Sequence, residues 1–312
     1  MRWRDCRRLP QLATSDTIGR VTRFNRKRSE RDCSLCGMSK SSRRGEHVLP
    51  RWFVSSVYGT GPWTVLRNGQ RMKTASGRPR SPDTTYPWPR LPCCLTCNGR
   101  LNTRFEEPSA EEVKQVVSGS SALTQEQANA AGLWLLKTLL LYSHPETEHP
   151  LDLERTWRHA PQQLYRWMLS ASEPPPPDLG LWVHRFASSS RPRGSLFDLW
   201  LPEVHADGEV YQCRAATVGL GNIGVTLLYH PGWNFEHPLE SEQAVARLWP
   251  GPSAVDLAAL PALQDWPLSY APGWQLDFED GAFDRANPLT LPMAIDTTSL
   301  PGVVGGSSPA SS

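Results

Sequence analysis

Long apolar segments are missing from this 312-residue sequence. The longest apolar run, 133–142, is interrupted by Lys137 and is far shorter than the ~20 residues that a membrane-spanning helix needs. The first residues carry charge but no apolar stretch typical of a secretory signal, so we expect a cytoplasmic protein with no membrane partner. The 29 prolines and 23 glycines exclude a long coiled coil or a collagen-like repeat. Hydrophobic residues make up 39% of the chain, which still permits a core to which the 13 tryptophans contribute.

Charge is distributed unevenly along the chain, although the net charge is only +2. Residues 1–104 contain 22 Lys and Arg against 6 Asp and Glu, a net charge of +16. Residues 105–312 contain 11 against 25, a net charge of −14. A basic segment of this kind is typical of a protein that neutralises nucleic-acid phosphates. The alternative is that a basic face docks onto the acidic part of the same chain.

Residue patterns predict an α+β protein with several segments. We interpret residues 1–30 as a basic flexible arm and residues 109–172 as a helical segment. One helix is expected to begin at Ser109, and a second should run over 124–143 after a capping box at Thr124. In the long loop before them, the Asn-Gly pair at 68–69 suggests a short hairpin.

The second half of the chain predicts strands. Four prolines at 174–177 mark a boundary, and an antiparallel-sheet α+β region of unknown role is expected over 178–300. A Gly/Ser-rich tail at 301–312 predicts disorder. The run at 219–224 has the Gly-x-Gly-x-x-Gly spacing of dinucleotide sites, but a strand pattern follows it, so we reject that interpretation. The expected strands are 181–183, 196–201, 209–213 and 223–229.

Five of the seven cysteines lie close together in the basic part of the chain. An odd number of cysteines without a visible signal favours reduced thiols, and close pairs then predict metal ligation. Two residues between thiolates allow both sulfurs to reach one tetrahedral ion, so Cys33, Cys36, Cys94 and Cys97 predict a closed structural zinc site. Cys93 could replace Cys94, at a longer spacing from Cys97. A redox pair is the other interpretation, but the βαβ context of such motifs is absent.

Two further motifs accompany the cysteines. Glu46 and His47 open the sequence Glu-His-Val-Leu-Pro between the pairs, which places an oxygen ligand beside a nitrogen base. After the second pair, a helix would place Asn98, Asn102 and Glu106 on one face.

Basic residues lie around the same two motifs. Arg100 and Arg104 would line up on the expected helix and, with Arg51, are candidates for phosphate binding. Glu106 and Glu107 are expected to form ion pairs with Arg100 or Arg104 at helical spacing.

The order of these motifs resembles the HNH endonuclease family. The resemblance rests on Cys-x-x-Cys, Glu-His-x-x-Pro and Cys-x-x-Cys-Asn with Asn102 four residues later, and it covers about Cys33 to Glu107. It implies a ββα-metal HNH domain on a four-cysteine zinc knuckle at residues 31–108. It also implies a metal-dependent endonuclease that hydrolyses DNA phosphodiester bonds.

Residue roles follow from the same resemblance. His47 corresponds to the general base, and Glu46 and Asn98 correspond to the ligands of one divalent ion, Mg²⁺ or Mn²⁺. Asn102 corresponds to a helix position near the scissile phosphate. The Asn that the family carries in a strand before the second cysteine pair has no counterpart in 86–92. This departure bears on the orientation of His47, which that Asn normally fixes.

The chemistry of phosphodiester hydrolysis agrees with two separate metals. A neutral histidine can take a proton from water near pH 7, and a hard divalent ion with oxygen ligands offsets charge on the phosphate and the departing oxygen. A four-thiolate zinc has no open position for either task.

DNA is the expected partner and RNA the alternative, and the sequence does not determine the oligomeric state. The competing functions are a non-catalytic zinc module that binds nucleic acid and, for the C-terminal part, a protein-interaction role. The remaining histidines are interpreted as structural or surface residues: His144, His149, His159, His184, His205, His230 and His237.

Overall fold

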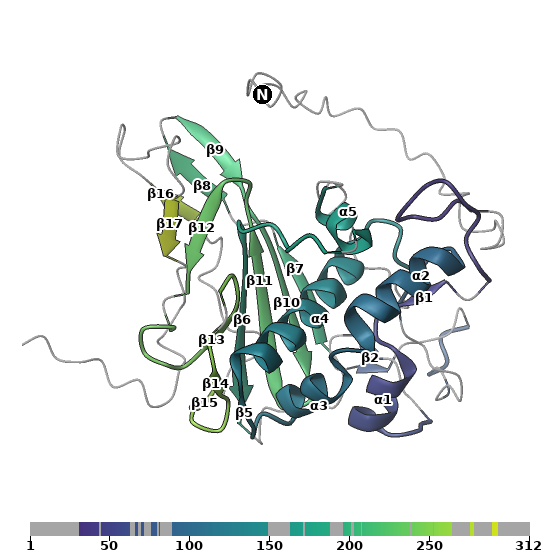
Figure 1. Ribbon diagram of the computed structural model, residues 1–312, viewed down its shortest axis with the longest axis horizontal. Coiled ribbons are helices and arrows are strands. Elements are labelled where there is room, and N and C mark those ends of the chain that lie inside the picture. Colours follow the sequence, from purple (N-terminus) through teal and green to yellow (C-terminus); the bar gives the residue numbers. More distant parts are fainter. Residues whose placement is uncertain are drawn as a thin grey trace, which may run out of the picture.

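The computed structural model covers the whole chain and combines helices with antiparallel strands (Figure 1). The expected arm at 1–30 and the expected tail at 301–312 lie outside the described residues. The described residues are 31–43, 45–62, 66–67, 70–71, 76–79, 81, 89–148, 163–170, 172–187, 196–200, 203–206, 208–237, 239–251, 253–263, 275–277 and 289–292.

Short elements form the N-terminal unit. Strand β1 (Glu46–His47) pairs antiparallel with β4 (Arg90–Leu91), so that Glu46 lies opposite Leu91 and His47 opposite Arg90. Helix α1 (Arg51–Tyr58) follows β1. The expected hairpin is confirmed by the antiparallel pair of β2 (Leu66–Arg67) and β3 (Gln70–Arg71).

The helix expected after the second cysteine pair is present but is not a regular α-helix. Helix α2 (Leu95–Leu101) continues directly into the π-helix η3 (Asn102–Glu106). The amide of Glu107 bonds to the carbonyl of Asn102 at 3.0 Å, which is the wider i to i−5 connection. The i, i+4, i+8 rule that we used to place three polar side chains on one face therefore fails here, because it assumes regular α-helical geometry.

Three further helices occupy the middle of the chain. Helix α3 (Ala110–Ser118) and helix α4 (Gln125–Ser143) are confirmed at the expected positions. Thr124 and Gln127 form the expected capping box at the start of α4. Helix α5 (Gln163–Leu169) follows, and residues 149–162 of the expected helical segment lie outside the described residues.

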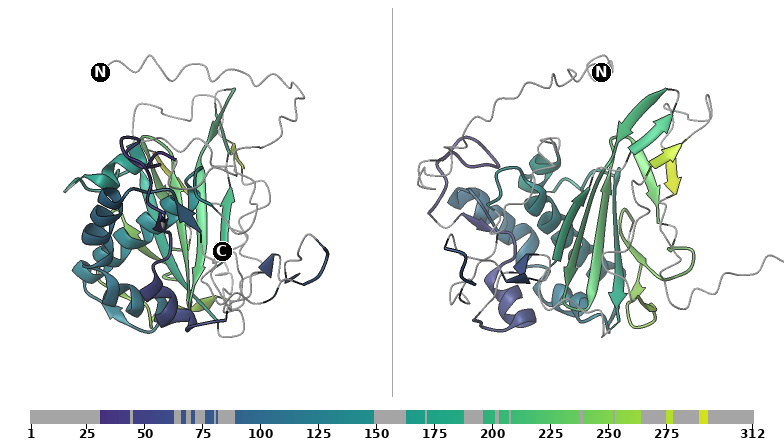
Figure 2. Two further views of the ribbon diagram at one scale, coloured as in Figure 1. Left: turned by 90° about the vertical axis from the view of Figure 1, so that its right-hand side faces the viewer. Right: turned by 180° about the vertical axis from the view of Figure 1, so that it is seen from behind.

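The largest sheet lies against α4. Its strand order is β13 (Ala246–Trp249), β6 (Leu179–Phe186), β11 (Ile223–Tyr229), β10 (Arg214–Leu220) and β7 (Leu196–Trp200), all antiparallel, with β15 (Ala262–Leu263) added in parallel to β6. Helix α4 crosses one face of this sheet and separates it from the N-terminal unit (Figures 1 and 2). The expected antiparallel sheet is thereby confirmed.

The glycine-rich run at 219–224 is a β-hairpin. Strand β10 ends at Leu220 and β11 begins at Ile223, and the turn between them contains Gly221 with φ +59°. A Cβ on Gly221 would lie 2.7 Å from the carbonyl oxygen of Val117, so glycine is required both by the backbone and by the close approach of α3. Strand β11, not a helix, follows the turn directly, which agrees with our rejection of a dinucleotide site.

Smaller sheets surround the large one. Strands β16 (Gln275–Asp277), β8 (Glu203–Ala206) and β9 (Glu209–Gln212) form a three-stranded sheet. Strand β12 (Trp233–Glu236) pairs in parallel with β17 (Leu289–Pro292). Strand β14 (Val255–Asp256) pairs with β5 (Ala122–Leu123) and so joins the C-terminal region to the helical segment.

One hydrophobic core joins the N-terminal unit, the helices and the large sheet. Its buried members extend from Val48 in the N-terminal unit through Trp134 in α4 to Leu260 near the C-terminal end. The segments at 31–108, 109–172 and 178–300, which sequence patterns distinguish, therefore share packing. Among the described residues, no helix is long and apolar enough to span a membrane.

Candidate metal centre and neighbouring polar cluster

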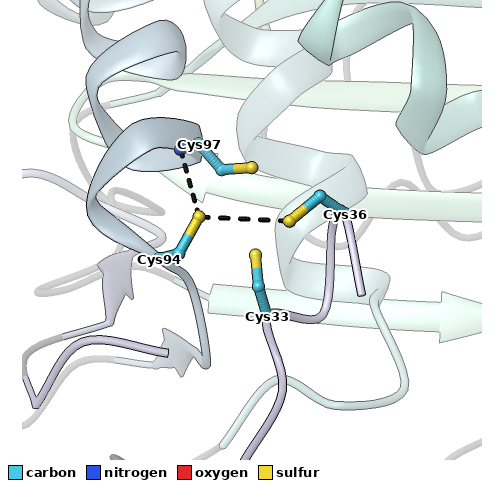
Figure 3. Close-up of side chains that lie close together, drawn as sticks. All are labelled: Cys33, Cys36, Cys94 and Cys97. Atoms are coloured by element: carbon cyan, nitrogen blue, oxygen red, sulfur yellow. Dashed lines mark hydrogen bonds between the residues drawn. The ribbon is translucent and has the colours of Figure 1, made fainter. Parts of the chain in front are cut away.

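Four cysteine sulfurs from two distant parts of the chain converge on one point (Figure 3). The Sγ atoms of Cys33, Cys36, Cys94 and Cys97 all lie within 4.8 Å of one another, and those of Cys36 and Cys94 are 4.0 Å apart. Four sulfurs at ~2.3 Å from a tetrahedral zinc would be about 3.8 Å apart. The cluster is therefore positioned to hold a metal ion such as zinc, as the two Cys-x-x-Cys pairs predicted.

Tight turns present the sulfurs of each pair. In the first turn the amide of Gly37 bonds to the carbonyl of Cys33 at 2.8 Å, and Gly37 has φ +66°. In the second, Cys94 caps helix α2, and its Sγ accepts the amide N–H of Cys97 at 3.4 Å. Both turns therefore direct thiol groups inward while the backbone groups around them remain hydrogen-bonded.

Backbone hydrogen bonds hold the two turns together. The amide of Ser34 donates to the carbonyl of Pro92 at 2.9 Å, and the amide of Ser42 donates to the carbonyl of Cys93 at 2.8 Å. The buried ring of His144, just after α4, also forms a hydrogen bond with the backbone of Ser34, and burial lowers the pKa of His144 to about 4. Our interpretation of His144 as structural is consistent with this position.

The structure distinguishes Cys94 from Cys93. Cys93 is fully buried, and its Sγ donates to the carbonyl of Cys94 at 3.5 Å instead of joining the four-sulfur cluster. Burial and the neighbouring thiols raise the pKa of Cys93. For Cys33, burial also favours the thiol, but hydrogen bonds from the backbone at Cys36, Cys94 and Leu35 outweigh it and lower the pKa to about 6. Backbone donors aimed at a sulfur are what a thiolate ligand requires.

A buried ion cluster lies next to this frame. The Glu46 carboxylate accepts a hydrogen bond from the Lys137 ammonium at 3.2 Å, and the Glu106 carboxylate accepts one from the same ammonium at 2.7 Å. The Lys137 side chain has no exposed surface, and those of Glu46 and Glu106 are only 6% and 10% exposed. Three elements, β1, η3 and α4, therefore meet at one cation.

The pKa values of this cluster reflect burial and mutual proximity. Burial and the neighbouring Glu106 carboxylate raise the pKa of Glu46 to about 7, although Lys137 opposes the shift. Burial alone would lower the pKa of Lys137, but the two carboxylates hold it above its ordinary value. The ammonium therefore stays charged, while Glu46 exchanges a proton near neutral pH.

His47 follows Glu46 on β1 and is half-buried. Successive side chains of a strand point to opposite faces, so His47 lies on the face of β1 away from the Lys137 cluster. Its neighbour across the sheet is Arg90. The expectation that Glu46 and His47 stand side by side is thus modified: they occupy the same strand but opposite faces.

The two asparagines of the predicted site have separate partners. Asn98 donates from Nδ2 to the carbonyl of Gly45, the residue before β1, at 3.3 Å. Asn102 donates to the Glu107 carboxylate at 2.5 Å. Helix α2 is therefore tied directly to the start of β1, whereas Asn102 is engaged within its own turn.

Of the three arginines predicted to bind phosphate, Arg104 has backbone carbonyl groups as its partners in the structure. The Arg104 guanidinium donates to the backbone carbonyls of Trp167, Ser170 and Glu173, and it lies 5.1 Å from the rings of Phe105 and Trp167. These contacts tie η3 to the end of α5, which sequence spacing could not reveal because the partners lie more than sixty residues away.

The other basic candidates and the expected ion pairs have different outcomes. Arg51 and Arg100 are exposed and stay candidates. The predicted pairing of Glu106 and Glu107 with Arg100 or Arg104 is wrong, because Glu106 bonds to Lys137 and Glu107 to Asn102. Local helical spacing did not anticipate the π-helical turn or a partner on α4.

Lys137 is the residue that sequence reasoning missed. It is the only charged residue within the apolar run 133–142, and that run forms the buried centre of α4. A lone lysine inside an otherwise apolar buried helix predicts a buried carboxylate partner, because an unpaired buried ammonium is strongly unfavourable. That signal could have directed attention to Glu46 and Glu106.

Comparisons with known proteins give no match. No protein family model, no curated protein and no solved structure matches the chain.

Proposed function

We propose that the N-terminal unit is an HNH-type, metal-dependent endonuclease that hydrolyses DNA phosphodiester bonds. The observation that carries the proposal is the hydrogen bond from Asn98 on α2 to Gly45, which ties α2 to the antiparallel pair of β1 and β4 beside the four-cysteine cluster. Two strands and a helix, with a histidine on the first strand and an asparagine on the helix, fit the ββα-metal arrangement that the motif order implies.

His47 is the proposed general base, which takes a proton from the attacking water. Glu46 and Asn98 are the proposed ligands of one Mg²⁺ or Mn²⁺ ion, which when bound would offset charge on the phosphate and the departing oxygen. Lys137 occupies Oε1 of Glu46, and the Asn98 hydrogen bond to Gly45 uses Nδ2. Glu46 and Asn98 would hold the ion through side-chain oxygen atoms, the type of ligand that such a hard ion prefers.

Substrate contacts are assigned to exposed residues of the same unit. Arg51 at the start of α1 and Arg100 in α2 are exposed, and Asn102 lies one turn further along the helix from Asn98. Contacts from arginine to phosphate position a nucleic acid without reading its sequence. DNA is the proposed substrate, and RNA is tested as the alternative.

A second candidate function is a zinc module that binds nucleic acid without cleaving it. The ion cluster favours it, because the Glu46 carboxylate is directed to Lys137 on the buried side of β1. In that case the cysteine cluster and the basic residues are functional, while His47 has only a structural role.

A cleavage assay on the full chain distinguishes the two functions. Plasmid, single-stranded DNA and RNA are incubated with the protein and Mg²⁺ or Mn²⁺, with EDTA as control, and binding is measured in parallel by fluorescence anisotropy. The endonuclease proposal predicts metal-dependent DNA cleavage that His47→Ala abolishes while DNA binding persists. Binding without cleavage by the wild-type protein supports the zinc module, and equal cleavage by His47→Ala removes the proposed mechanism.

A further inference from the structure

The ion cluster joins the proposed active site to the centre of the protein. Glu46 belongs to a strand of two residues, held to β4 by a register of two residue pairs. Lys137 belongs to α4, a helix of 19 residues that packs on both the large sheet and η3. The ammonium therefore connects the two-residue strand β1 to the 19-residue helix α4.

The charges of Glu46 and Glu106 explain why Lys137 is needed at this position. The two carboxylates are nearly buried and come within hydrogen-bonding distance of one ammonium, so Lys137 is the cation that offsets both of them. Without it, Glu46 and Glu106 would face each other in a region shielded from water, where like charges repel strongly. Without Lys137, the Glu46 carboxylate would be repelled by the Glu106 carboxylate. The Glu46 side chain would then move away, and β1 would be displaced with it.

Glu46 is also adjacent to the residue on which the proposed chemistry depends. His47 follows it directly and lies on the opposite face of β1. The preceding Gly45 has φ +60°, and a Cβ at this position would lie 2.5 Å from the carbonyl oxygen of Leu91. The strand is thus closely confined by β4 on one edge and anchored by a carboxylate on its buried face.

We propose that Lys137 is a positioning residue: by binding Glu46 on the buried face of β1, it fixes the strand that presents His47 on the other face. The effect on cleavage rests on the proposed function, whereas the effect on His47 does not. Lys137 contacts neither substrate nor the reacting atoms in this account, and it acts only through Glu46.

Two variants perturb the same cluster in different ways. Lys137→Met keeps a side chain of similar length but removes the ammonium that holds Glu46. Glu106→Gln is the matched control, because it retains the Lys137 contact to Glu46 and still offers Lys137 a carbonyl oxygen. Both changes alter one charge in the same buried cluster, so a general effect of disturbing the core would appear in both.

The experiment measures His47 directly as well as cleavage. The His47 ring signals are recorded in ¹H–¹³C spectra of the full chain, assigned with His47→Gln, and single-turnover cleavage is measured at saturating divalent ion. We expect Lys137→Met to shift the His47 signals and to lower the cleavage rate by about 100-fold, the loss typical of a displacement near 1 Å, with DNA binding retained. Glu106→Gln should leave the His47 signals in place and the rate within about threefold of wild type.

A double variant tests whether Lys137 acts through Glu46. The loss caused by Lys137→Met should vanish when Glu46 is already Gln, since coupled residues do not contribute additively. If folded Lys137→Met has wild-type His47 signals, or if Glu106→Gln shifts them equally, the inference is overturned. If the wild-type protein does not cleave DNA but Lys137→Met alone shifts the His47 signals, the proposed function fails and the positioning role stands.

Discussion

Replacing Lys137 by Met should be among the most destabilising single changes in this protein. The lysine side chain is fully buried, and its ammonium contacts two nearly buried carboxylates at 2.7 and 3.2 Å. Removing one partner of a buried ion pair typically costs about 3–5 kcal/mol, because the remaining charge stays buried without compensation. The equilibrium between folded and unfolded protein should therefore shift by about two to three and a half powers of ten.

The same change should make stability more dependent on pH. The pKa of Glu46 is already raised to about 7, so the folded state binds a proton that the unfolded state has released above about pH 4.5. This contribution favours folding at lower pH and is lost as pH rises through about 7. Lys137 normally lowers this pKa, so its removal raises the pKa of Glu46 further. The folded variant then keeps the proton on Glu46 up to a higher pH. The stability deficit of Lys137→Met should consequently increase between pH 6 and 8, by at most about 1.4 kcal/mol per pH unit for each extra proton bound.

Urea unfolding followed by tryptophan fluorescence measures this effect, since Trp134 is fully buried in the same helix. Glu106→Gln serves as the control and should lose only about 1 kcal/mol, the contribution of an ordinary hydrogen bond. A Lys137→Met variant as stable as wild type at pH 8 would refute the reasoning, because it would mean that Glu46 and Glu106 do not depend on this cation.

Three further predictions concern the backbone at the site, the arginine bonded to carbonyl groups near α5 and the response to acid. Gly45→Ala should weaken the pairing of β1 with β4, since the residue has φ +60° and its Cβ would lie 2.5 Å from a β4 carbonyl oxygen; cleavage and thermal unfolding should both report the loss. Arg104→Met should lower stability in urea by about 1–3 kcal/mol, because it leaves carbonyl groups without their donor. DNA affinity measured by anisotropy should then be unchanged, whereas Arg100→Met should weaken binding. Burial lowers the pKa of His184 and of His237 to about 3, so the contribution of each histidine to stability is full above about pH 6.5 and falls toward pH 4, by up to about 1.4 kcal/mol per pH unit for each group. The raised pKa of Glu46 offsets one of these two slopes, so stability should still fall. Urea titrations at pH 7 and pH 5 check this slope, and equal stability at the two values would contradict it.

Local sequence signals predicted the features that local geometry determines. The capping box at Thr124 and the hairpin between β2 and β3 follow from residues close together in the chain. In the cysteine cluster, spacing within each pair was informative because two thiols in a tight turn can reach one ion.

The remaining features depend on contacts between distant segments. Lys137 is 91 residues from Glu46 and 31 from Glu106, so no spacing rule connects them. The π-helical turn at Asn102–Glu106 changed the faces that a regular helix would present. Arg104 looked like a phosphate ligand because its sequence neighbourhood is basic, while its actual partners are carbonyl groups near α5.

The account depends most directly on a single ion held by the four sulfurs. Zinc content of the reduced, purified chain, measured together with X-ray absorption at the zinc edge, tests it. We expect about one zinc per chain, bound by four sulfurs at ~2.3 Å, and loss of the metal when Cys33 or Cys97 is replaced by Ser. A chain that folds without zinc, or a zinc ion bound mainly by oxygen or nitrogen, would contradict the account.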